Sequence, residues 1–209
     1  VTYGKAQWMD HRGRPLPQIL GAPLKFPRQV LASLLYGDSV CPIAVVLRRS
    51  GLERVGGYDE SLIGNEDWDL WLRLALYYPY LFHNAILARY RSHPGNLTAS
   101  GSNRFRQLIA DRIRVVDKFY VRPSLPSEAL KMKPVAYRNV YQDIAIRHLS
   151  IGQWRLAVDY LARAARAAPG GRLFLLRSVG VIIYYLFLSK TGWGVRLVSA
   201  LGARRGQAR

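Results

Sequence analysis

The sequence predicts an α/β region followed by an all-α region, and two observations carry this prediction. Residues 41–48 are an apolar run rich in β-branched side chains that suits a buried strand, and Arg89 and Arg91 alternate around Tyr90 on what looks like a strand after residues 81–87. From residue 104 onward, apolar side chains recur at the 3.6-residue spacing of helices. We therefore expect three parts along the chain: a domain at residues 1–100, a helical extension at 101–171, and an apolar helix with a basic tail at 172–209.

The first elements are short. Residues 1–4 look like a strand end, and Asp10-His11-Arg12-Gly13 looks like a turn. Several prolines follow, and because proline cannot donate a backbone hydrogen bond, they predict an irregular arm that ends in a helical turn at residues 27–35.

A second helix is predicted at residues 51–55. Ser50 and Glu53 have the spacing of a capping box, which marks the start of a helix. Gly56 and Gly57 end it, because glycine readily takes the positive φ found after helix ends.

A third helix carries most of the functional argument. Trp68 to Leu76 is almost wholly apolar, which predicts burial. Its start is acidic instead, with Glu66, Asp67 and Asp69 after a possible cap at Asn65. Acids suit the positive end of a helix dipole, but three of them beside buried tryptophans exceed what capping needs. A carboxylate fixed in this way can take a proton from an attacking hydroxyl.

Four segments around this helix resemble, in order and spacing, the second half of family 2 glycosyltransferases, which have the GT-A fold. The segments are Arg48-Arg49-Ser50, Val55-Gly56-Gly57-Tyr58-Asp59-Glu60, Glu66-Asp67-Trp68-Asp69-Leu70-Trp71-Leu72-Arg73 and Ala88-Arg89-Tyr90-Arg91-Ser92-His93. The resemblance covers roughly residues 1–100. It implies a partial GT-A domain that holds the acceptor side of an inverting, hexosyltransferase-like enzyme.

The resemblance also implies roles for particular residues. The catalytic residues are Asp67, as general base, and Glu66. The substrate-binding and acceptor-binding residues are Gly56, Gly57, Trp68 and Arg91. His93 corresponds to the family's histidine near the metal and the donor diphosphate, so the complete enzyme is expected to use a divalent cation, Mg or Mn.

The family's metal-binding Asp-x-Asp has no counterpart before Tyr3. Asp67-Trp68-Asp69 has the same spelling but opens a helix instead of following an apolar strand, so we interpret it as unrelated. Because the chain begins at Val1, we expect a fragment of a longer protein, with the remaining metal ligands upstream and no activity by itself.

The rest of the chain predicts helices. Residues 104–120 carry an apolar stripe, and residues 136–150 and 154–168 form a pair with Gly152 in the turn. This pair resembles one tetratricopeptide hairpin, which cannot form a solenoid alone. Residues 173–188 are apolar but shorter than a membrane span requires. They fit a buried helix, an in-plane membrane anchor or a poor transmembrane helix.

Net charge and cysteine content limit which partners and which compartment we expect. The formal net charge is +18, from 31 Lys and Arg against 13 Asp and Glu, and most of the excess follows residue 100. Such a surface favours anionic partners, but no nucleic-acid-binding module is recognisable, so none is expected. Cys41 is the only cysteine, which fits the cytosol. We expect a cytoplasmic enzyme. In one interpretation it binds peripherally at the inner face of the cell membrane.

The predicted function is transfer of a sugar from a nucleotide-diphosphate sugar to an acceptor hydroxyl with inversion. Cell-surface polysaccharide and glycolipid synthesis are the expected settings, and a lipid-linked acceptor fits the basic surface. The alternative is a non-enzymatic basic helical module that docks partners or anionic membranes. It accounts for residues 101–209 but leaves the combination of acidic, glycine and histidine motifs unexplained.

Overall fold

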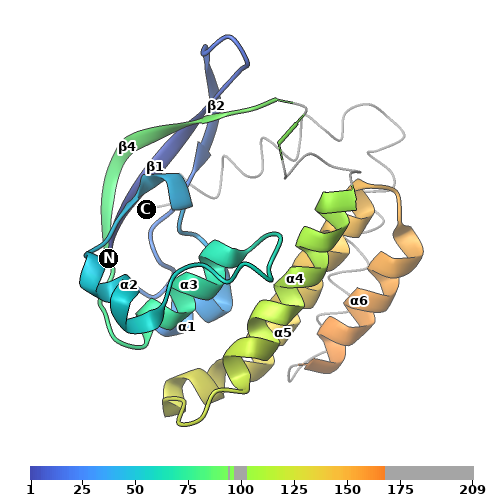
Figure 1. The fold of residues 1–209 in the computed structure, drawn as a ribbon. Coiled ribbons are helices and arrows are strands. Elements are labelled where there is room, and N and C mark those ends of the chain that lie inside the picture. The colour runs from blue at the N-terminus through green and yellow to red at the C-terminus, as the bar shows by residue number, and fades with distance from the viewer. Residues whose placement is uncertain (94, 97–102, 168–209) are drawn as a thin grey trace. The chain divides into compact units, whose positions relative to one another are not determined.

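A computed structural model of the chain describes residues 1–93, 95–96 and 103–167 (Figure 1). These residues belong to one compact unit, Val1–Ala168. The predicted apolar helix at 173–188 and the basic tail lie outside the described residues. The α/β region followed by helices is confirmed.

The sheet is small and mixed. Its central strand β1 (Thr2–Met9) pairs antiparallel with β2 (Pro15–Leu20) and with the two-residue β3 (Val45–Val46). On its other edge it pairs in parallel with β4 (Leu81–Arg91), from Thr2 opposite Leu81 to Met9 opposite Arg91. β2 and β3 share the edge of β1 opposite β4. β2 pairs with the end of β1, and β3 pairs with its start.

Two predictions about the early chain are wrong. Residues 15–20 were predicted to be irregular but form β2, an edge strand in which proline is tolerated. The predicted buried strand at 41–48 is a 3₁₀ turn, η1 (Pro42–Ala44), followed by β3, in which Val46 is 71% exposed. Pro42 suits the first position of a helical turn, so the apolar run bends at the sheet edge.

The helix α2 (Arg49–Val55) begins two residues earlier than the predicted capping box requires. Arg48 takes the N-cap position, no side chain caps the helix, and Ser50 lies within it. The predicted end is confirmed, because Gly56 adopts φ 83° and its N–H donates to the Leu52 carbonyl over 2.7 Å.

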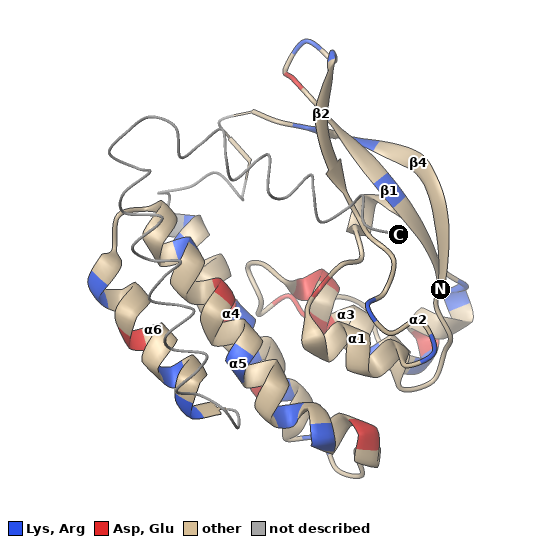
Figure 2. Ribbon diagram, turned by 180° about the vertical axis from the view of Figure 1, so that it is seen from behind, with Lys and Arg blue, Asp and Glu red and all other residues tan. Residues whose placement is uncertain are grey.

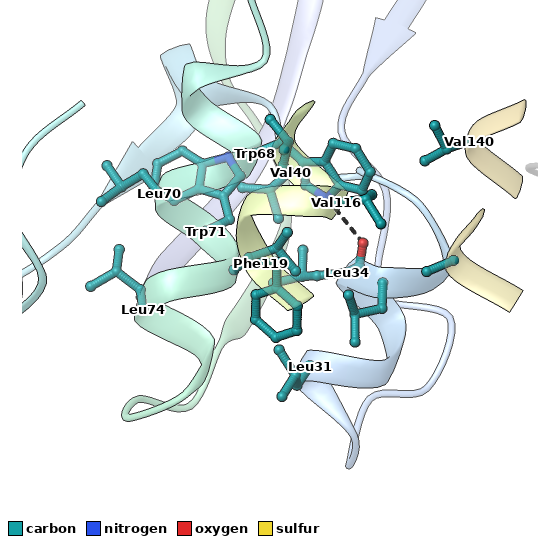
Figure 3. Packing of buried hydrophobic residues seen from close by; sticks show 14 of the residues in the cluster. Leu31, Leu34, Val40, Trp68, Leu70, Trp71, Leu74, Val116, Phe119 and Val140 are labelled. Carbon is teal, nitrogen blue, oxygen red and sulfur yellow. Dashed lines mark hydrogen bonds between the residues drawn. The ribbon is translucent and has the colours of Figure 1, made fainter. Parts of the chain in front are cut away.

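The core forms around α3 (Glu66–Ala75), as predicted for a buried helix. α3 contacts α1 (Val30–Tyr36), α2 and α4 (Asn103–Tyr120). All seven residues from Trp68 to Leu74 are buried. Trp68 donates its indole N–H to the Leu34 carbonyl over 2.9 Å and so ties α3 to α1 (Figure 3).

The remaining helices form a hairpin against this core. α5 (Ser127–Ser150) contacts α1 and α4 and continues through the turn at Gly152, φ 76°, into α6 (Trp154–Ala167). The prediction missed the first part of α5 because Pro134 is uncommon inside a helix. Within the described ranges, no helix combines the length and apolar character needed to cross a bilayer.

Candidate functional site

The glycine loop after α2 is held by one buried arginine. Arg73, on α3, donates from Nη1 to the carbonyls of Val55 (2.6 Å) and Gly56 (3.0 Å), and from Nη2 to that of Gly57 (2.6 Å). Its Nε donates to Asp69 Oδ2 over 2.8 Å, and both side chains are less than a tenth exposed. The loop that contains both predicted glycines is therefore fixed to the last turn of α3.

Asp69 belongs to this clamp. Its second oxygen, Oδ1, lies 3.0 Å from Lys118 Nζ on α4, and Lys118 also pairs with Asp59 Oδ2 over 2.6 Å. Both oxygens of Asp69 are thus occupied by cations of the protein itself. This agrees with the interpretation of Asp67-Trp68-Asp69 as a helix start and not a metal motif.

Glu66 and Asp67 form the first turn of α3, where acidic residues gather (Figure 2). Asn65 stands at the N-cap with φ 63°, and its side chain makes no capping hydrogen bond. Its Nδ2 donates to the Leu108 carbonyl and its Oδ1 accepts from Arg112 Nη1, each over 2.8 Å. The start of α3 is therefore attached to α4 by side chains.

Two carboxyl groups at this position have raised pKa values. Burial is the main cause for Asp67, and the charge of Glu66 adds to it, while the Trp68 N–H and Arg112 oppose the rise. Burial also raises the pKa of Asp38, from the loop after α1, and the charge of Asp67 raises it further. A carboxyl group with a raised pKa is a stronger base than an ordinary one.

Tyr58, in the glycine loop, faces the same acids. Partial burial raises the pKa of its phenol, and the charges of Asp67 and Glu66 raise it further. The residue is 53% exposed. Tyr58 is therefore accessible from solvent and close enough to both acids for their charges to act on its phenol.

Arg91 and His93 lie in a different environment, at the end of β4. Arg91 Nη1 donates to the His11 carbonyl over 2.9 Å, so it supports the β1–β2 turn. His93 is exposed, and its backbone N–H and carbonyl bond with Asn96. Among the described residues, no recorded contact joins either side chain to Asp67.

Sequence reasoning missed four members of the site: Asp38, Tyr58, Arg73 and Arg112. Arg73 carried a signal, because it is a lone charge in an apolar helix four residues after an acid. Tyr58 lies inside the glycine segment that carries the family resemblance, but the resemblance assigned it no role. Asp38 and Arg112 carried none, since their nearness to Asp67 depends on how α1 and α4 pack.

A metal site is not complete in the described part of the chain. Within residues 1–93, 95–96 and 103–167, no group of three or more His, Cys, Asp or Glu side chains could hold an ion. The divalent cation implied by the family resemblance, with His93 as one ligand and the others expected upstream of Val1, therefore stays a prediction.

Comparison with known proteins bears on the same elements. Residues 32–125 match a glycosyltransferase-like family 2. The matched stretch runs from α1 to the loop after α4 and contains the glycine loop, both acids and the clamp. It supports a domain of this type, and thus glycosyl transfer from a nucleotide-sugar donor to an acceptor, at the level of the family. The chain matches no curated protein and no solved structure.

Proposed function

We propose that this chain carries the acceptor side of an inverting glycosyltransferase and that Asp67 is its general base. The observation that carries the proposal is the state of Asp67: a half-buried carboxyl with a raised pKa, on the first turn of a buried helix. It lies inside the stretch matched to the family. A helix start fixed to α4 through Asn65 is the kind of support that a catalytic group needs.

In the proposed reaction, the acceptor hydroxyl approaches Asp67 with its proton directed at a carboxylate oxygen. Asp67 takes that proton as the hydroxyl oxygen bonds to the anomeric carbon of the donor sugar. The bond from that carbon to the diphosphate oxygen breaks on the opposite face, and the configuration inverts. The diphosphate leaves with the electron pair.

The neighbours of Asp67 have supporting roles. Glu66 keeps the local field negative, which favours the protonated form of Asp67 after transfer. The Arg73 clamp fixes Gly56 and Gly57, so the acceptor meets backbone that does not move. The predicted divalent cation stays a prediction, and no step of this mechanism passes through it. A hexose donor, a lipid-linked acceptor and a setting in polysaccharide or glycolipid synthesis are finer proposals that rest on the family resemblance.

The test is replacement of Asp67 by asparagine in the full-length protein, with sugar transfer from a labelled donor and donor affinity measured separately. We expect turnover to fall by about 10²- to 10⁴-fold, with donor affinity unchanged, because Asp67 acts on the acceptor. Glu53→Gln is the matched control, since Glu53 is an exposed acid in the same matched stretch. Turnover retained in Asp67→Asn would remove Asp67 from the base role.

A further inference from the structure

A cavity of about 280 Å³ lies beside the start of α3, between the end of α1, α4 and α5. Asp38 and Trp68 line it from the matched core, Arg112 lines it from α4, and Gln142 and Asp143 line it from α5. α5 begins at Ser127, after the stretch matched to the family ends. One wall of the cavity therefore comes from a helix outside the matched stretch.

The polar groups of the cavity have unused hydrogen-bonding capacity. Arg112 is largely buried, and its Nε lies 2.8 Å from Asp143 Oδ2 without the direction of a hydrogen bond. Asp38 accepts only a long bond, 3.2 Å, from the Val40 N–H. In the described structure the Gln142 amide makes no hydrogen bond, although it is half-buried. Among the described lining residues, Arg112 Nε is a buried atom without a hydrogen-bond partner, which is costly unless water or a ligand completes it.

The cavity lining mixes both signs of charge. Asp143 lies 2.8 Å from Arg112 and 2.6 Å from Arg147, and burial raises the pKa of Asp38. No single sign of charge dominates the lining. It offers a guanidinium donor, carboxylate acceptors and an amide that does both. A hydroxyl group donates and accepts at once, so a molecule with several hydroxyls matches this set best.

The size of the cavity limits its occupant. Ligand pockets begin at roughly 300 Å³, so this one suits a single small ring better than an extended chain. Asp67 is the residue before Trp68, and its charge acts on Asp38. A ring held in the cavity would therefore lie beside Trp68, the residue that follows the proposed base.

We propose that this cavity binds one sugar ring of the acceptor, and that Gln142 on α5 helps to set which acceptor is used. This inference rests on the proposed function, because it assigns the ring to the molecule that Asp67 deprotonates. The helical extension would then contribute to substrate choice while the matched core contributes the chemistry.

The test measures binding of methyl hexopyranosides by saturation-transfer NMR. Asp67→Asn protein is used so that no turnover occurs. We expect at least one glycoside of the panel to bind. Gln142→Leu keeps the side-chain volume but removes the amide, and should weaken that binding about five- to tenfold. Gln107→Leu is the matched control, since Gln107 is exposed on α4 outside the cavity lining, and should bind as the parent does.

Two results would overturn the inference: no glycoside binds, or Gln142→Leu binds as tightly as Gln107→Leu. Neither depends on turnover, so both differ from failure of the proposed function. That failure would appear as undiminished sugar transfer by Asp67→Asn protein without the Gln142 substitution.

Discussion

Removing Arg73 should destabilise the protein far more than removing any exposed arginine. Arg73→Ala deletes four hydrogen bonds of 2.6–3.0 Å: three to the glycine loop and one to Asp69. It also leaves the Asp69 carboxylate buried. Loss of one partner of a buried ion pair costs about 3–5 kcal/mol. Because Lys118 still lies 3.0 Å from Asp69, we expect the lower end, about 3 kcal/mol.

The matched control is Arg163→Ala. Arg163 pairs with Asp159 over 2.9 Å at the same four-residue spacing on α6, but both side chains are about half exposed. An exposed pair of this kind contributes about 0.3–0.5 kcal/mol. Because both ion pairs have the same spacing, the difference between the two losses of unfolding free energy measures the effect of burial and of the carbonyl contacts.

The assay is urea unfolding followed by tryptophan fluorescence, because Trp68 and Trp71 lie on the same helix as Arg73. Thermal unfolding should show a fall in Tm of roughly 6–12 °C for a chain of this size. If Arg73→Ala does not fold, Arg73→Lys keeps the charge but loses the forked geometry, and should still unfold at lower urea than the control. An Arg73→Ala loss equal to that of Arg163→Ala would refute the reasoning.

Two further predictions concern buried polar groups. Trp68→Phe should cost about 1 kcal/mol more than Trp71→Phe in urea unfolding, because only the Trp68 indole has a hydrogen-bond acceptor while both rings are equally buried; a larger loss for Trp71→Phe would contradict it. Asp38→Asn should stabilise the protein at pH 8 by about 1–3 kcal/mol and leave it unchanged near pH 4. The pKa of Asp38 is raised in the folded state, so its ionisation lowers stability as the pH rises above the carboxyl's ordinary range; an equal effect at both pH values would be inconsistent with this cause.

The central helix and its acids were predictable from sequence because each signal was local. An apolar stretch from Trp68 with carboxylates in the preceding turn can be recognised without knowing any neighbour. The end of α2 at Gly56 was predictable for the same reason, since positive φ is a property of the residue.

The errors arose where the outcome depended on sheet position. The apolar run at 41–48 has strand composition, but composition does not say whether a strand crosses the core or ends at an edge. Pro15 and Pro17 suggested an irregular arm, yet an edge strand leaves room for residues without an N–H. Pairing partners far along the chain decided both cases.

Only part of the candidate site could be predicted from the sequence. Asp67 and Glu66 are recognisable as adjacent acids at the start of an apolar helix, whereas Asp38, Arg112 and Gln142 come from three separate elements. Their meeting depends on α1 and α4 packing against α3 and on α5 packing against α1 and α4. No spacing along the chain encodes it, and no repeated motif marks these side chains.

The parallel pairing of β1 with β4 has a consequence for synthesis of the chain. β1 ends at Met9, but its partner strand is complete only at Arg91. During translation, β1 and its hairpin with β2 emerge early, while one edge of β1 keeps unpaired backbone groups. Unpaired edges favour association with other chains, and contacts between distant segments form slowly. The α5–α6 hairpin, by contrast, closes locally. The nascent chain is therefore most exposed to aggregation, and most dependent on chaperones, before β4 leaves the ribosome.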